Sequence, residues 1–352
     1  MKRRSFIKIV GGTAGSCVLG VDPVLAKAEA SAEAKTTSPG SLPRRVLGRT
    51  GEKISIIGFP GLSLMHYKQD ECDRGVKKVF DMGLNYFDVA PAYNNGDCEI
   101  KLGVALQQLP RDKYFLSCKT KMRDKEGARQ ELERSLQRLK TDHFDLYQMH
   151  HLVSTDQVQQ AFGKDGAMET FLKAREAGKI RFLGFSAHTT RAALAALKAF
   201  NFDTVMFPLN FGEYYRHGFG KEVLELAREK GTAAIAIKPM SYGAWPAGVK
   251  RTREWWYRSP ETVEEIGAVL RFTLSLEGVV AGIPPSFLDL TEKAIQAAYD
   301  YRPITEPEKE KLKERAASFL SIFRREEEQL AMDDRHHPYP HHPCDAYPCQ
   351  HA

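Results

Sequence analysis

Short apolar segments alternate with amphipathic segments along most of the chain, and this alternation limits the possible folds more than any other feature. Near-continuous apolar runs of this length are typical of parallel strands that are buried on both faces. The eight expected strands are residues 55–61, 85–87, 114–120, 144–151, 180–186, 204–209, 233–240 and 279–284. A helix is expected after each strand, and eight strand–helix pairs in about 250 residues predict a closed α/β barrel of the (β/α)8 TIM type.

A doubly wound sheet is the alternative fold for such alternation. It usually has a Gly-rich phosphate loop after its first strand. The segment Ile57-Gly58-Phe59-Pro60-Gly61 contains no GxGxxG pattern, so the barrel is favoured, and we assign it to residues 44–304. A small hairpin is expected at residues 47–54.

A further helix is expected after the barrel, within residues 305–331. It opens with Thr305-x-x-Glu308, which is a capping box, and Pro307 lies in its first turn. An apolar stripe along this helix favours packing on the barrel over binding to a partner. Residues 332–352 form a tail that is rich in His, Cys and Pro.

Residues 1–28 are typical of a twin-arginine signal peptide. Lys2-Arg3-Arg4-Ser5-Phe6-Ile7-Lys8 resembles the twin-arginine motif, a mildly apolar stretch follows, and Ala26-Lys27-Ala28 offers a small-x-small cleavage site. A basic N-terminal arm is the alternative. Residues 29–43 are expected to be a disordered linker. These features predict a periplasmic or otherwise exported protein, with the twin-arginine export machinery as a partner.

Charge and cysteine content narrow the class of protein. The 352 residues carry a formal net charge of +6. The signal segment contributes five basic residues and Asp22, a net +4, which leaves +2 for the rest. So small a charge gives no reason to expect nucleic acid as a partner. No apolar run reaches the roughly 18 residues of a membrane span. Without Cys17 an odd number of widely spaced cysteines remains, so no disulfide framework is predicted.

Polar side chains lie at the ends of three successive expected strands. They are Asp88 with Tyr93 in the loop that follows, Lys119, and His150 or His151. Each has an ordinary explanation, namely a helix cap, a solvent-exposed lysine and a core histidine. Their joint occurrence in order is much less ordinary, because the carboxyl ends of barrel strands meet at one mouth where barrel enzymes place their chemistry.

Four stretches resemble the aldo-keto reductase family: GLNYFDVAPAYNNGDCEIKLGVAL, YFLSCKT, LERSLQRLKTDHFDLYQMHH and GKIRFLGFSAH. The resemblance extends from about Arg45 to Ala298. It implies that Asp88, Tyr93, Lys119 and His150 form a catalytic tetrad. His150 is preferred to His151 because the family motif places its histidine five residues after the Asp of DLY.

The roles that the resemblance implies agree with the chemistry of carbonyl reduction. A phenol with a pKa near 10 is a poor acid at neutral pH unless a nearby cation stabilises the phenolate. Lys119 would supply that cation, Asp88 would hold Lys119, and His150 would orient the carbonyl oxygen. We expect an NAD(P)-dependent oxidoreductase that interconverts a small carbonyl, or a sugar-like substrate, and an alcohol. A nicotinamide-binding barrel that acts as a non-catalytic sensor or scaffold is the alternative.

The resemblance also implies positions that contact the cofactor. They are Gly61, Ser186, Asn210, Lys238 and Ser286. Three positions depart from the family pattern and carry Ala187, Met206 and Ile237 instead of the usual Asn, Gln and Tyr. The family favours NADP over NAD, but Pro284-Pro285-Ser286-Phe287 lacks the basic residue that often meets the adenosine 2′-phosphate. The loop from Tyr242 to Arg258 is long enough to act as a lid.

The tail has a composition that suits a divalent metal. His341, His342, Cys344 and Cys349 are its candidate ligands, because thiolates and imidazoles bind zinc, copper or nickel. The spacing matches no standard zinc finger, and the alternative is a disordered polar tail.

Overall fold

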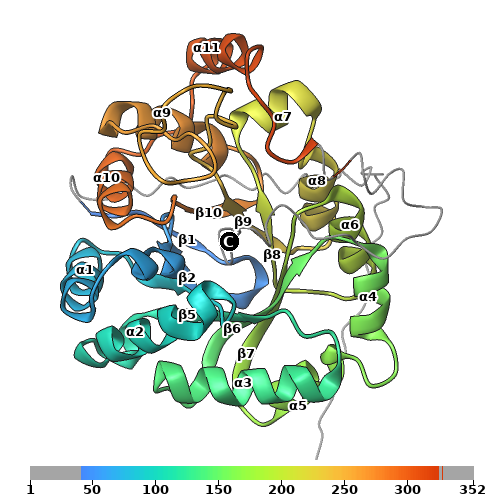
Figure 1. Cartoon of the computed structure of the whole chain (residues 1–352). Coiled ribbons are helices and arrows are strands. Elements are labelled where there is room, and N and C mark those ends of the chain that lie inside the picture. Colours follow the sequence, from blue (N-terminus) through green and yellow to red (C-terminus); the bar gives the residue numbers. More distant parts are fainter. Residues whose placement is uncertain (1–40, 325–326, 328–352) are drawn as a thin grey trace, which may run out of the picture. The chain divides into compact units, whose positions relative to one another are not determined.

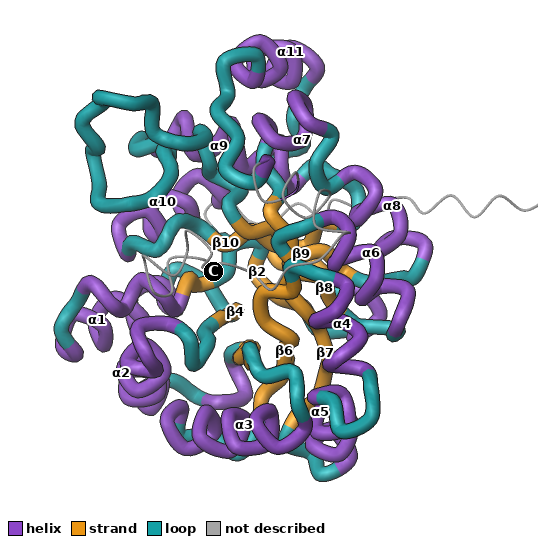
Figure 2. Tube along the Cα trace, turned by 45° about the vertical axis from the view of Figure 1, so that its right-hand side comes forward, coloured by secondary structure: helices purple, strands orange, loops and turns teal. Residues whose placement is uncertain are grey.

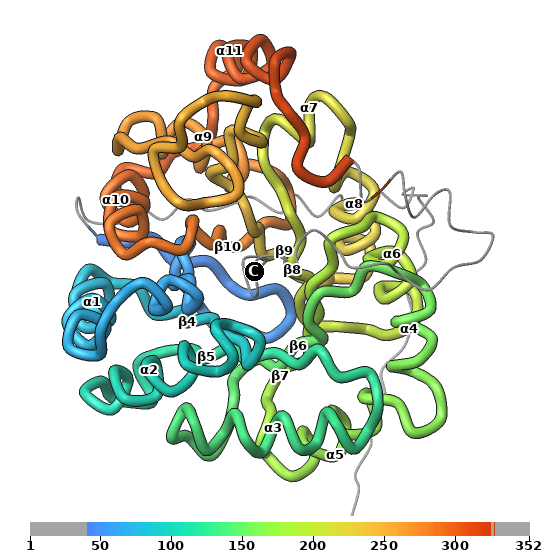
Figure 3. Tube along the Cα trace, viewed as in Figure 1, coloured from blue at the N-terminus to red at the C-terminus, as the bar shows by residue number. Residues whose placement is uncertain are grey.

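The computed structural model describes residues 41–324 and residue 327, and it confirms the predicted barrel. One parallel sheet contains, in order, β3 (Phe59–Pro60), β4 (Tyr86–Asp88), β5 (Phe115–Thr120), β6 (Phe144–Leu152), β7 (Ile180–Ala187), β8 (Thr204–Pro208), β9 (Ala233–Ile237) and β10 (Val279–Ile283). The sheet closes because Gly58 N donates to Gly282 O at 3.0 Å and Gly282 N donates to Ile56 O at 2.9 Å. The first and last strands therefore lie side by side, blue against orange in Figure 3.

Helices surround the ring of strands (Figures 1 and 2). They are α1 (Gln69–Asp81), α2 (Asp97–Ala105), α3 (Lys125–Leu139), α4 (Thr155–Phe162), α5 (Ala167–Glu176), α6 (Thr190–Ala199), α7 (Phe211–His217), α8 (Lys221–Glu229), α9 (Val263–Leu274) and α10 (Leu288–Tyr299). α1, for example, packs with the buried side chains of Val76 and Val79 in the core. No helix in the described residues is both long enough and apolar enough to cross a bilayer.

The predicted hairpin covers the end of the barrel where the strands begin. It consists of β1 (Arg44–Val46) and β2 (Lys53–Ser55), which pair antiparallel. Leu47 and Ile54 join the interior cluster of the barrel. Arg45 NH1 donates to Val279 O at 2.7 Å, at the start of β10. The hairpin thus closes one end, so the opposite end, where the strands terminate, is the one left for a site.

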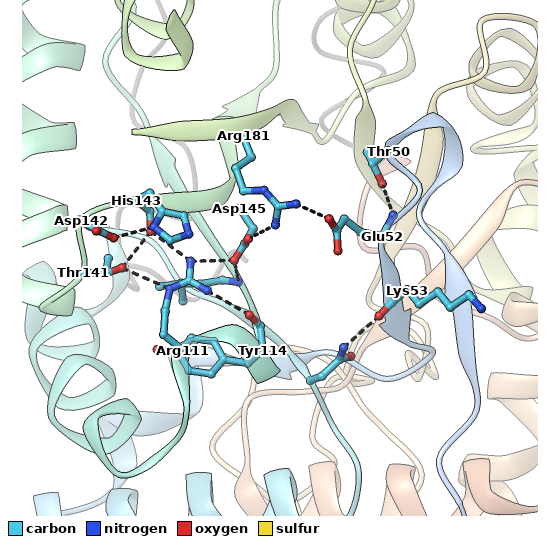
Figure 4. A network of polar contacts seen from close by, with 12 residues as sticks. Thr50, Glu52, Lys53, Arg111, Tyr114, Thr141, Asp142, His143, Asp145 and Arg181 are labelled. Carbon is cyan, nitrogen blue, oxygen red and sulfur yellow. Dashed lines mark hydrogen bonds and ion pairs between the residues drawn. The ribbon is translucent and has the colours of Figure 1, made fainter. Parts of the chain in front are cut away.

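A charged network reinforces the hairpin end (Figure 4). The buried carboxylate of Asp145 accepts hydrogen bonds from Arg111 NH2 at 2.8 Å, Arg181 NH1 at 2.6 Å and Leu116 N at 2.8 Å. Arg181 also pairs with Glu52 of the hairpin. A cavity of about 700 Å³ lies beside this network. The charges at the centre of the network are paired with one another. Such pairing is expected of the face of a TIM barrel that serves stability rather than catalysis.

The C-terminal helix is shorter than the sequence predicts. α11 spans Glu306–Ala316, which is only part of the predicted range 305–331, and its capping box is present. The helix ends because the chain turns to reach Glu213 of α7, whose carboxylate accepts from Ser321 Oγ at 2.8 Å and Ile322 N at 2.8 Å. The turn buries Phe319 and Phe323. The segment therefore packs on the barrel, as expected, but as a helix followed by a turn.

Candidate active site

The structure brings the four predicted catalytic residues together at the mouth of the barrel. Asp88 ends β4, Tyr93 begins the short helix η3 (Tyr93–Gly96), Lys119 lies near the end of β5 and His150 near the end of β6. All four are buried, and the Lys119 side chain is 0% exposed. A fully buried ammonium is expensive unless it is paired, so its contacts indicate what holds it.

Lys119 connects the carboxylate to the phenol. Its Nζ donates to Asp88 Oδ2, to Tyr93 OH at 2.9 Å and to Val89 O at 3.3 Å. The other carboxylate oxygen, Asp88 Oδ1, accepts from Gln148 Nε2 at 3.3 Å. The ammonium therefore lies where a negative charge on the Tyr93 oxygen would form, and such a cation favours the phenolate.

The loop that presents Tyr93 has an unusual backbone. Asn94 and Asn95 have φ angles of 46° and 52°, and Gly96 has 88°. Asn tolerates this left-handed region better than most residues, because its short polar side chain bonds locally. Here Asn94 Nδ2 donates to Asp97 Oδ2 at 3.1 Å. The turn connects Tyr93 directly to the start of α2 at Asp97.

His150 lies against Tyr93 as a neutral group. The two rings are 5.6 Å apart between centroids and meet edge to face at 82°. Burial lowers the pKa of His150 well below its usual value, and Lys119 lowers it further. His150 Nδ1 has no hydrogen-bond partner among the described residues. A neutral imidazole beside the phenol can bind a carbonyl oxygen, whereas the ring of His151 faces His188 instead, with centroids 4.4 Å apart.

The predicted cofactor positions lie at the ends of five strands. Ser186 Oγ accepts from His151 N at 2.7 Å. Asn210 Oδ1 caps α7 through Glu213 N at 3.0 Å, and Asn210 Nδ2 is buried without a partner among the described residues. Lys238 Nζ lies 3.2 Å from His188 Nε2. The buried amide donor of Asn210, which has no partner among the described residues, fits the carboxamide of a nicotinamide ring.

The other two positions are less informative about a cofactor. Ser286 follows β10 and is buried. Gly61 follows β3, and a Cβ there would lie 2.5 Å from Asp88 O. The glycine is therefore required by the close approach of β3 to β4, and its role in cofactor binding stays a prediction.

The chain is similar to known proteins over most of its length. The model of the aldo/keto reductase family matches residues 60–317, which is more than half of the chain. The chain belongs to the aldo/keto reductase family. Family membership makes it an oxidoreductase of the NAD(P)-dependent type.

Individual members of the family are distant relatives. The chain is 28% identical to L-galactose dehydrogenase of Arabidopsis thaliana over 233 residues, 62% of this chain and 70% of that protein. It is 26% identical to the NADH-specific methylglyoxal reductase of Escherichia coli over 216 residues, 53% of this chain and 64% of the reductase. The holo form of an aldo-keto reductase from Bacillus halodurans has a TM-score of 0.64 at 22% identity and covers 80% of this chain and 98% of its own.

Sequence reasoning missed two residues that hold the tetrad of this aldo/keto reductase. Gln148 bonds to Asp88 as described above and to Ser117 Oγ at 2.9 Å. Tyr86 OH donates to Asp88 Oδ1 at 3.4 Å. Side chains alternate along a strand, so Tyr86 shares a face with Asp88, and Gln148 shares one with His150. That alternation was the signal that could have identified both.

The loop predicted as a lid is tied down at its base. Tyr242 N donates to Arg258 O at 2.7 Å and Arg258 N donates to Gly243 O at 2.9 Å. Within the loop, Trp256 lies near Lys238, with the ammonium 5.8 Å from the ring centroid. The base is thus fixed, and lid motion of the rest of the loop stays a prediction.

The predicted metal ligands His341, His342, Cys344 and Cys349 lie outside the described residues. Within the described part of the chain, no group of three or more His, Cys, Asp or Glu side chains is arranged to hold a metal ion. The metal site on the tail therefore stays a prediction.

Proposed function

We propose that this protein interconverts a carbonyl and an alcohol by hydride transfer, with Tyr93 as general acid and base. The observation that carries this proposal is the position of Lys119 Nζ, 2.9 Å from Tyr93 OH and paired with Asp88. A tyrosine that keeps its proton would not need a buried cation beside its hydroxyl oxygen. A tyrosine that gives up its proton in the reaction does need one, because the cation stabilises the phenolate.

Each side chain has a distinct task in this proposal. Tyr93 gives its proton to the carbonyl oxygen during reduction and takes it back during oxidation. Lys119 stabilises the phenolate in between, and Asp88 keeps the ammonium in place. His150, neutral because of burial, donates a hydrogen bond that orients the carbonyl oxygen. A bound nicotinamide cofactor supplies the hydride.

We infer that Ser186 and Asn210 hold the nicotinamide end of the cofactor, while Lys238 meets its diphosphate. The family favours NADP. The loop after β10 gives no added preference for the adenosine 2′-phosphate of NADP. The guanidinium beside this loop, that of Arg253 near Phe287, is already paired with Glu261 at 2.7 Å and Asp289 at 2.6 Å. We therefore expect only a weak preference for NADPH over NADH.

The substrate that we propose is a small carbonyl compound or a sugar-like alcohol. The names of the two relatives, a sugar dehydrogenase and a reductase of a small ketoaldehyde, support this class. An aromatic ring near the predicted cofactor position Lys238 supports it too, since the half-buried Trp256 lies with its ring centroid 5.8 Å from the Lys238 ammonium. Flat aromatic faces pack well against the apolar faces of sugar rings.

A non-catalytic sensor or scaffold is the alternative proposal. It is favoured by the three departures from the family pattern, since Met206 and Ile237 are part of the packed barrel interior and Ala187 is buried. Such a barrel would bind nicotinamide weakly or hold it without turnover.

Absorbance at 340 nm, where reduced nicotinamide absorbs, tests the choice between the two. The purified protein is mixed with NADH or NADPH and with methylglyoxal or, in the reverse direction, with NAD or NADP and L-galactose. The enzyme predicts a substrate-dependent change that follows multiple turnovers. Cofactor binding without any substrate-dependent change, over a panel of aldehydes and sugars, would favour the scaffold.

A further inference from the structure

The strand that carries His150 is irregular at the histidine itself. β6 pairs regularly with β7 as far as Met149 opposite Phe185, and the next paired residue is Leu152 opposite Ala187. His150 and His151 lie between these pairs, and His151 has a φ angle of 60°. Irregularities of this kind re-aim side chains next to active sites. The backbone of this dipeptide therefore needs support from outside the sheet.

Arg123 provides that support. It lies in the loop between β5 and α3, and its NH2 donates to His150 O at 2.6 Å and to His151 O at 3.2 Å. Its NH1 donates to Thr120 O at 3.4 Å, at the end of β5. The side chain is buried, with the residue 8% exposed. One guanidinium thus joins the end of β5 to the irregular end of β6.

The loop that carries Arg123 is itself fixed. Ala167 N donates to Arg123 O at 2.8 Å, and Lys125 N donates to Asp165 O at 2.8 Å. The backbone around Arg123 is therefore bound to the segment that leads into α5. A guanidinium on such a rigid support holds its acceptors in place better than one on a free loop.

The charge of Arg123 has no carboxylate partner among the described residues. Glu131 raises its pKa, but the carboxylate of Glu131 accepts hydrogen bonds from Thr120 Oγ1 at 2.6 Å and from Arg134 at 3.0 Å. Burial lowers the pKa of Arg123 to about 10, so it stays charged at neutral pH. A buried cation held by carbonyl groups alone is costly, and costly groups of this kind gather at functional sites.

We propose that Arg123 is a positioning residue, which fixes the imidazole of His150 against Tyr93 by holding the carbonyl oxygens of His150 and His151. The inference rests on the proposed function, in which His150 orients the carbonyl oxygen of the substrate. Arg123 touches neither substrate nor cofactor in this scheme. It acts through the backbone of β6.

The same arrangement keeps the imidazole neutral. After burial, the groups that lower the pKa of His150 are Lys119 and Lys121 from the β5 side, then His151 and Arg123. Tyr93 is the titratable group on the other side of the ring. Two acids at this mouth are already engaged, Asp88 by Lys119 and Glu131 by Thr120 and Arg134. Removing Arg123 removes one cation and loosens the packing that buries the imidazole of His150. Both changes should raise the pKa of His150.

Replacement of Arg123 separates a positioning role from a structural one. In Arg123→Met we expect kcat to fall by about 10- to 100-fold, since small displacements of a catalytic group cost that much. The dissociation constant of the cofactor should stay the same, and the acid limb of the pH profile of kcat should move to higher pH. Arg123→Lys, which keeps the charge and one donor, should recover part of the loss. Arg129→Met, an exposed arginine on α3, is the matched control and should leave kcat unchanged.

A second measurement keeps the test independent of turnover. The titration of His150 is followed by NMR on protein with isotope-labelled histidine, with the signal assigned by its loss in His150→Gln. We expect the pKa of His150 to rise in Arg123→Met and, by less, in Arg123→Lys, which also serves if the Met variant does not fold. An unchanged titration together with unchanged kcat in a folded variant overturns the proposal. A wild-type protein that reduces no carbonyl contradicts the proposed function instead, while the titration still decides the role of Arg123.

Discussion

At the residue scale, the site depends on the buried ion pair of Lys119 and Asp88 and on one buried imidazole, that of His150. Lys119 is compensated by Asp88, and together they act on Tyr93. His150 has no carboxylate partner among the described residues, so burial and the surrounding cations keep it neutral. This difference is the reason why the proposed function gives proton transfer to Tyr93 and the orientation of the carbonyl to His150.

The neutral state of His150 predicts a dependence of stability on pH. The folded pKa is well below the usual value of 6.5, so the unfolded chain takes up a proton first as the pH falls. Stability contributed by the neutral ring is complete above about pH 6.5 and is lost below it, by at most about 1.4 kcal/mol per pH unit.

Urea unfolding of wild type and His150→Gln at about pH 7 and about pH 5.5 measures this term. The variant should lose less free energy of unfolding between the two conditions, because the other histidines titrate alike in both proteins. Equal losses would mean that His150 titrates alike in the folded and the unfolded chain.

At the element scale, the ends of β4, β5 and β6 each contribute a group to the site, and this is why much of the fold and site could be predicted. The apolar runs that became β4, β5 and β6 are visible in the sequence, and so are Asp88, Lys119 and His150 at their ends. The end of α11 was not predictable, because it depends on Glu213, which is distant in sequence. Arg123 looked like an ordinary loop residue, because its burial depends on the chain that leads into α5.

The network at the other end of the barrel predicts a separable effect. Asp145→Asn removes the charge that Arg111 and Arg181 share, and breaking a buried ion pair costs about 3–5 kcal/mol. Because the side chains of Arg111 and Arg181 are 27% and 42% exposed, we expect a smaller loss of about 2 kcal/mol.

Chemical denaturation measures that loss, and Asp112→Asn, at an exposed position, is the control that should leave stability nearly unchanged. Turnover of Asp145→Asn under native conditions should match wild type, because the hairpin end takes no part in the chemistry. A large loss of kcat with unchanged stability would contradict this division between the two ends of the barrel.

At the scale of the whole molecule, the predicted export signal and the cofactor have to be reconciled. Free nicotinamide cofactor is scarce outside the cytoplasm, so an exported reductase that released it each cycle would stop after one turnover. The twin-arginine route carries folded proteins, which lets the barrel close around its cofactor first. We propose that the exported enzyme retains its cofactor and regenerates it with a second substrate.

Protein purified from the exported fraction should therefore contain bound nicotinamide and follow ping-pong kinetics with an alcohol–carbonyl pair. Cofactor released by denaturation is measured by chromatography. The control, Arg3→Lys with Arg4→Lys, should remain in the cytoplasm and yield a loaded protein there. An exported protein that arrives empty, and binds added cofactor only weakly, would count decisively against retention.

The central claim is that Tyr93 transfers the proton, and the kinetics of Tyr93→Phe test it most directly. The substitution keeps the ring that packs on His150 and removes the hydroxyl that Lys119 contacts. We predict that kcat falls by about 10²- to 10⁴-fold, the usual contribution of a positioned acid, while the dissociation constant of the cofactor changes little. A Tyr93→Phe protein that turns over at the wild-type rate would contradict the account.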